Sequence, residues 1–127
     1  MHFYITSIVG GIFALMTVIL SALVSKRRLD TKTSLVDGGD NILQRRIRAH
    51  GNFSEYAPMM LILLGLLENA AINSSIVCFV GISFLISRSL HAFALITRGK
   101  LIFISAAMLL QHATFIFCGI YLLKRFI

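Results

Sequence analysis

Apolar residues occur in long blocks along the chain, separated by short polar stretches. The first block, residues 3–25, contains no charged residue. As a helix it would span about 34 Å, enough to cross the hydrocarbon core of a bilayer. The following blocks predict helices over 42–68, 76–96 and 101–123. Because the connections are short, the pattern predicts an up-and-down bundle of four transmembrane helices.

The composition excludes an ordinary soluble domain. Of the 127 residues, 57% are hydrophobic and only 13% are charged, a balance outside the range of soluble globular proteins. We therefore expect an all-α integral membrane protein with a single domain, residues 1–127, in contact with the lipid bilayer. The net charge of +7 would suit nucleic acid, but the basic residues flank the apolar blocks and form no basic face with interleaved aromatics. Nucleic acid is thus not an expected partner.

The distribution of basic residues predicts the orientation. Residues 26–48 contain seven Lys and Arg residues and the turn 98–100 contains two, whereas residues 69–75 contain none and the C-terminal end two. Loops rich in Lys and Arg stay in the cytoplasm. The first and third connections should therefore face the cytoplasm, and both termini should lie outside.

The first connection contains Asp37-Gly38-Gly39-Asp40, a sequence typical of a turn. Asp40 or Asn41 is placed to cap the helix that follows. The glycine pair lacks the lysine spacing of a phosphate-binding loop and the pattern of a calcium-binding EF-hand. We interpret this segment as a turn.

Polar residues gather on one side of the second helix. They have the spacing i, i+4, i+7 and i+8 and are Arg48, Asn52, Glu55 and Tyr56. The third helix adds Arg88 and His91, one turn apart. Charged residues are costly inside a membrane and are therefore candidates for a functional site. The structural alternative is a network in which these groups only neutralise one another.

The second helix contains the run Arg48-Ala49-His50-Gly51-Asn52-Phe53-Ser54-Glu55-Tyr56-Ala57-Pro58. This run resembles R-A-x-x-N-x-x-E-Y-x-P, the signature of the MAPEG family, the membrane-associated proteins of eicosanoid and glutathione metabolism. The preceding Asp37-Gly38-Gly39-Asp40 and Leu43-Gln44 resemble the small bacterial inner-membrane branch. The resemblance implies a MAPEG-like membrane domain in the bacterial inner membrane that assembles as a homotrimer.

The resemblance also implies a site for glutathione between neighbouring subunits. The residues expected to bind it are Arg28, Arg48, Asn52, Glu55, Tyr56, Arg88 and His91. For the first connection the choice between Arg27 and Arg28 stays open. In family members an arginine near the start of the fourth helix activates the thiol, and Arg98 and Lys100 are available at that place. Leu95 stands where family members often have a tyrosine.

The chemistry of these residue types suits glutathione. Guanidinium groups pair with carboxylates through two hydrogen bonds, and a positive field favours thiolate over thiol. We therefore expect a glutathione-dependent transferase or peroxidase that acts on a lipophilic electrophile, with its active site facing the cytoplasm. No histidine pair has a carboxylate at metal-ligand spacing, so a metal site is not expected.

Two other classes compete with an enzyme. A non-catalytic membrane scaffold or lipid-binding protein of the same fold would keep the polar residues for folding. A small multidrug-type transporter is less favoured, because such proteins carry their carboxylate in the first helix, which is uncharged here.

Overall fold

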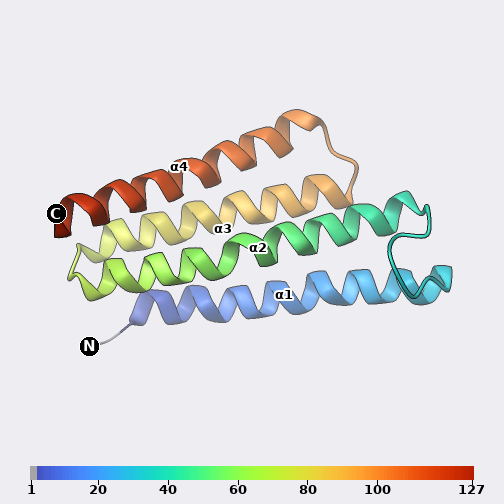
Figure 1. Ribbon diagram of the computed structural model, residues 1–127, viewed down its shortest axis with the longest axis horizontal. Coiled ribbons are helices and arrows are strands. Elements are labelled where there is room, and N and C mark those ends of the chain that lie inside the picture. The colour runs from blue at the N-terminus through green and yellow to red at the C-terminus, as the bar shows by residue number, and fades with distance from the viewer. Residues whose placement is uncertain (1–2) are drawn as a thin grey trace.

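The computed structural model describes residues 3–127, which form an antiparallel bundle of four helices (Figure 1). The helices are α1 (Tyr4–Thr31), α2 (Asn41–Asn69), α3 (Ser74–Ile96) and α4 (Leu101–Phe126). Each helix packs against the next in the sequence, and both termini lie at one end of the bundle. The predicted up-and-down bundle is confirmed.

Three helices within residues 3–127 are long and apolar enough to cross a membrane, namely α1, α3 and α4. The helix α2 is not apolar enough to be counted with them, because the polar residues of its first half lower its mean hydropathy. It nevertheless runs antiparallel between α1 and α3 and connects their opposite ends (Figure 1). A chain that crosses with α1 and again with α3 must return through α2. The bundle is an all-α integral membrane protein.

The end of α1 departs most from the expected bounds, since this helix continues past Ser25 to Thr31. The expected end followed the loss of hydropathy. Lysine, arginine and leucine are nevertheless good helix formers, and past the bilayer core their charge costs little. Lys32, in the left-handed conformation with φ 53°, then ends the helix.

The first connection is held by Asp40, which is the N-cap of α2. Its side chain accepts a hydrogen bond from the Leu43 amide at 2.6 Å and forms an ion pair with Arg27 at 2.7 Å. These bonds, with Arg27 the stronger, lower the pKa of Asp40 to about 2. Gly38 and Gly39 have positive φ, as the predicted turn requires. The end of α1 is thereby fixed to the start of α2.

A carboxylate at the opposite end caps α1. The two side-chain oxygens of Glu68, in the last turn of α2, accept hydrogen bonds from the amides of Ile5 at 2.8 Å and Thr6 at 2.9 Å. No side chain at its own N-cap caps α1, so Glu68 satisfies donors that would otherwise lack partners. No local sequence pattern indicates this contact between residues far apart in the chain.

The centre of the bundle is aromatic, with one phenylalanine from each helix. Phe13 lies 5.5 Å from Phe53 and 5.4 Å from Phe84, measured between ring centroids, and Phe84 lies 5.9 Å from Phe115. Such tilted and edge-to-face pairs are favourable. Through Phe84, this apolar cluster packs against the side chain of Arg88.

Candidate functional site

Arg88, in the second half of α3, is a buried cation with 1% of its surface exposed. Its guanidinium donates hydrogen bonds to the side-chain oxygen of Asn52 on α2 and to Ser87 Oγ at 3.2 Å. Within residues 3–127 no carboxylate forms an ion pair with it. Because a buried charge is costly unless it is paired, Arg88 is suited to hold a negatively charged group.

Aromatic rings surround this guanidinium. Its central carbon lies 5.7 Å from the ring centroids of Tyr56 and Phe84, within the range of cation–π attraction. Tyr56 in turn packs against Phe115 on α4, with ring centroids 6.1 Å apart. The rings exclude water on these sides and hold the cation in place, so they pre-organise it.

Ser87 positions the same group and was missed by the sequence analysis. Its hydroxyl accepts from Arg88 and donates to the Ala107 carbonyl of α4 at 3.0 Å. It thereby connects the guanidinium to α4. A serine in an apolar helix carries no distinctive signal, because small polar residues commonly occur there for packing.

His91 lies one helical turn after Arg88 and is 6% exposed. On α2, Asn52 is 8% exposed and Tyr56 is half-buried. The structure therefore gathers Arg88, His91, Asn52 and Tyr56 at the interface of α2 and α3. These four of the predicted site residues form one inward-facing cluster.

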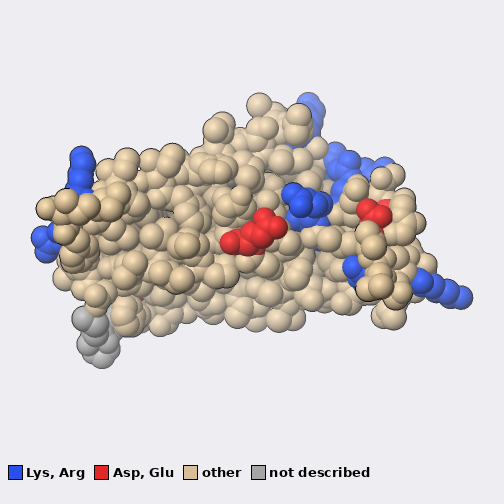
Figure 2. All heavy atoms as spheres, viewed as in Figure 1, with Lys and Arg blue, Asp and Glu red and all other residues tan. Residues whose placement is uncertain are grey.

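The polar side of α2 is divided between the interior and the surface. Asn52 and Tyr56 face inward, whereas Arg48 and Glu55 are exposed and their side chains make no hydrogen bond or ion pair with other residues in 3–127. Glu55 lies midway along α2. Figure 2 shows acidic and basic atoms side by side midway along an otherwise mostly uncharged surface. Charges at this depth are costly in lipid. We therefore expect this edge of α2 to contact polar or charged groups and not acyl chains.

The predicted thiol-activating residues lie apart from this cluster. Arg98 and Lys100 are exposed in the turn between α3 and α4. From the helical rise, Arg98 lies about 15 Å further along the direction of α3 than Arg88. Within one chain, the structure does not bring these two bases to the buried arginine.

The bases of the first connection are engaged locally. Arg27 pairs with Asp40, and Arg28 donates to the carbonyls of Ser34 at 3.1 Å and Val36 at 2.9 Å. Arg28 therefore holds the connection that follows α1. Its contacts within the chain do not include the cluster around Arg88.

Comparison with known proteins bears on the identity of this arrangement. A model of the MAPEG family matches residues 6–124. The inner membrane protein YecN from two strains of Escherichia coli is 31% identical over 87 residues, which covers 65% of this chain and 66% of each relative. The match thus spans just under two thirds of the length of these relatives. No solved structure gives a significant match.

Proposed function

The chain belongs to the MAPEG family, and on this premise we propose that it is a membrane enzyme that uses glutathione as a co-substrate. The family includes glutathione transferases and peroxidases. The observation that supports the proposal most directly is Arg88, a cation with 1% exposure and no carboxylate partner within residues 3–127. A carboxylate of glutathione would neutralise this charge.

The groups of glutathione match those of the candidate site. The peptide has two carboxylates, an ammonium and a thiol. Arg88 and Arg48 offer guanidinium groups for the carboxylates, and Glu55 offers a carboxylate for the ammonium. Asn52, Tyr56 and His91 add neutral hydrogen-bonding groups around Arg88. The proposed ligand thus pairs charges that have no partner of opposite charge within residues 3–127.

The proposed reaction passes through the glutathione thiolate. In the transferase reaction the sulfur bonds to an electrophilic carbon, and the leaving group departs or the adduct takes up a proton. In the peroxidase reaction two glutathione molecules reduce a hydroperoxide to an alcohol and water and form a disulfide. The positively charged side chain of Arg98 or Lys100 would stabilise the thiolate electrostatically. Lipophilic electrophiles would arrive from the bilayer.

The exposed and unpaired side chains of Arg48 and Glu55 favour a site shared between copies. A neighbouring subunit would cover this edge of α2 and add its own polar groups around the ligand. A homotrimer is therefore part of the proposal.

The membrane orientation is also part of the proposal. The protein is an integral inner-membrane protein, as its relatives are. Basic atoms gather mainly at the end of the bundle that carries the α1–α2 and α3–α4 connections, with a smaller group at the other end (Figure 2). By the positive-inside rule the end with the α1–α2 and α3–α4 connections faces the cytoplasm, and the termini lie outside.

The decisive test is glutathione binding by calorimetry to the detergent-purified protein, with thiolate formation followed by ultraviolet absorbance. We expect saturable binding to the wild type, loss in Arg88→Gln and in Arg48→Ala, and retention in Arg125→Gln, which removes an exposed arginine at the other end. A folded wild type that binds no glutathione at millimolar concentration would overturn the proposal. The polar residues would then be structural, as in a membrane scaffold.

A further inference from the structure

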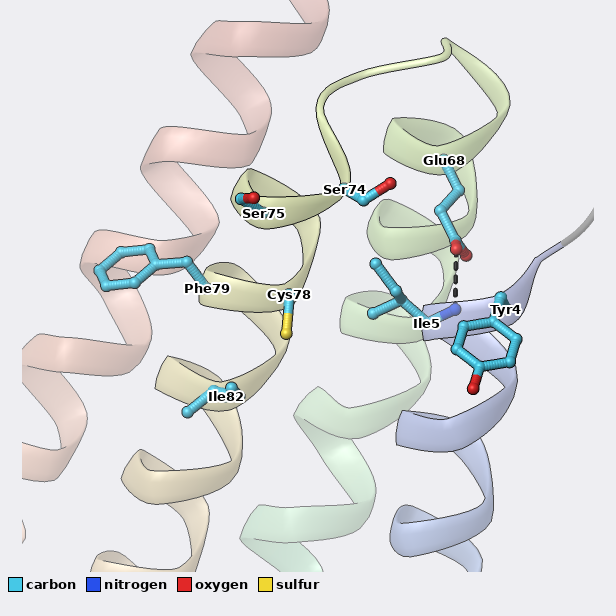
Figure 3. Close-up of a pocket in the computed structure, with 8 residues that line it drawn as sticks. All are labelled: Tyr4, Ile5, Glu68, Ser74, Ser75, Cys78, Phe79 and Ile82. Carbon is cyan, nitrogen blue, oxygen red and sulfur yellow. Dashed lines mark hydrogen bonds between the residues drawn. The ribbon is translucent and has the colours of Figure 1, made fainter.

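A hollow lies at the end of the bundle opposite the basic connections. It opens between α1 and α3 beside the α2–α3 connection and has a volume of about 690 Å³ (Figure 3). This size is in the range of small-molecule and cofactor sites, about 300–1,000 Å³. None of its lining residues belongs to the cluster around Arg88. The hollow is therefore separate from the proposed glutathione site.

The lining of this hollow changes from polar to apolar along α3. Ser74 and Ser75 lie at the start of the helix, with Ser74 on the side of Glu68 and Ser75 on the side away from it, and Phe79 and Ile82 follow one and two turns further on (Figure 3). Because α3 crosses the membrane from this end, its first turn lies near the headgroups and the later turns lie among the acyl chains. The gradient has the same direction as that of a phospholipid.

Glu68 gives the polar end of the hollow a negative charge. Both of its oxygens accept amide hydrogen bonds from the start of α1, but an ionised carboxylate can accept about four. No Lys or Arg within residues 3–127 forms an ion pair with it. It therefore has spare acceptor capacity, and the start of α1 balances only part of its negative charge beside a groove that opens towards lipid.

The geometry points to a binding site for a phospholipid with a primary ammonium headgroup, such as phosphatidylethanolamine, in the leaflet on the side of the termini. The ammonium contacts Glu68, the hydroxyl of Ser74 donates to the phosphate, and an acyl chain lies along Phe79 and Ile82.

Charge and hydrogen bonding select this headgroup against its competitors. Phosphatidylglycerol has no ammonium and would place an unbalanced negative charge beside Glu68. Phosphatidylcholine has a cation whose methyl groups remove every N–H donor, so it cannot complete the carboxylate's hydrogen bonds. Discrimination of this kind rests on a repulsive or unsatisfied group in the wrong ligand.

The test measures which lipid the intact chain retains. The protein is placed in nanodiscs with equal shares of the ethanolamine, choline and glycerol phospholipids, and the lipids that stay bound are identified by native mass spectrometry. We expect about threefold enrichment of the ethanolamine lipid over choline, the size expected for one exposed charge contact. The enrichment should be lost in Glu68→Gln and kept in Asp30→Asn, which removes an exposed acid at the other end.

A second variant separates recognition from folding, because Glu68 also caps α1. Ile82→Trp fills the apolar part of the hollow and leaves Glu68 unchanged, so it should also lose the lipid. Equal retention of the ethanolamine and choline lipids by the wild type would overturn the proposal. So would loss in only one of the two variants, since the site needs both the carboxylate and the groove.

Cys78 provides a local probe of occupancy, because it lines the hollow and is exposed, whereas Cys118 is buried. A membrane-permeant maleimide should alkylate Cys78 about threefold more slowly in bilayers with the ethanolamine lipid than in bilayers with choline lipid. This difference should disappear in Glu68→Gln. Equal alkylation rates in the two lipids, whether fast or slow, would overturn the proposal.

Discussion

Arg88 on α3 donates a hydrogen bond to the side-chain oxygen of Asn52 on α2, and this contact joins the two helices at the candidate site. Both residues are buried. The amide oxygen is neutral, so the contact satisfies a donor without cancelling the charge. The cluster is thus stable enough to position a cation and still able to attract an anion.

This arrangement predicts a non-additive effect on stability. Asn52→Leu should destabilise the protein by about 3 kcal/mol, because it leaves the buried guanidinium short of a partner. The double variant Asn52→Leu with Arg88→Met removes both polar groups and should lie within about 1 kcal/mol of the wild type. Unfolding in detergent, monitored by circular dichroism, measures the free energy of unfolding of the single and the double variant. A double variant as unstable as Asn52→Leu would show that packing, and not the unpaired charge, sets the cost.

The sequence predicted the helices well because their signal is local. An apolar block between polar connections indicates a transmembrane helix, and the candidates for the cap of α2 were only Asp40 and Asn41. The pairing of Arg88 with Asn52 depends on how α2 and α3 are rotated about their axes, which no local pattern specifies. The spacing on α2 placed Arg48 and Glu55 on the same side as Asn52, but that side is wide enough for the helix interface to divide it.

The cap at the start of α1 predicts local opening when it is removed. Glu68→Gln keeps the side-chain length and one acceptor oxygen but replaces the other with a donor. The amides of Ile5 and Thr6 should then lose one bond and a favourable charge at the helix N-terminus, at a cost of about 1 kcal/mol. Hydrogen exchange with mass spectrometry should show faster exchange in the first turns of α1 and an unchanged rate in α4. Equal protection in the variant and the wild type would contradict the role of this cap.

The ion pair between Asp40 and Arg27 predicts a dependence of stability on pH. Hydrogen bonds from Arg27 and from the Leu43 amide lower the pKa of Asp40 to about 2, against about 3.9 in an unfolded chain. A depressed carboxyl pKa stabilises the fold above the unfolded value, and this contribution is lost as the pH falls from about 4 towards about 2.

Asp40→Asn isolates this effect, because asparagine is also a good N-cap. Its melting temperature should lie below that of the wild type at neutral pH, and the two should converge as the pH approaches about 2. High salt should reduce the difference, since the pair is partly exposed to solvent. A constant difference across this pH range would assign the stabilisation to something other than the ionised carboxylate.

The turn between α3 and α4 offers a way to decide which positively charged side chain stabilises the proposed thiolate. Arg98 has φ 57°, a left-handed conformation that glycine adopts freely and other residues adopt at a cost of about 1 kcal/mol. Arg98→Gly should therefore raise the free energy of unfolding by about that amount. Lys100, at the N-cap position of α4 with φ −61°, carries no such strain, so Lys100→Gln should leave stability nearly unchanged.

The activity of these variants then shows which of the two residues stabilises the thiolate. If Arg98 stabilises the thiolate, Arg98→Gly should lower kcat about tenfold or more and raise the pH at which the thiolate absorbance appears, with glutathione affinity retained. Lys100→Gln should show the same loss if Lys100 has that role. A more stable Arg98→Gly with unchanged kcat would show that the strained arginine serves neither folding nor thiolate formation. A loss in both variants would indicate a shared positive field, because two nearby cations act on the same sulfur.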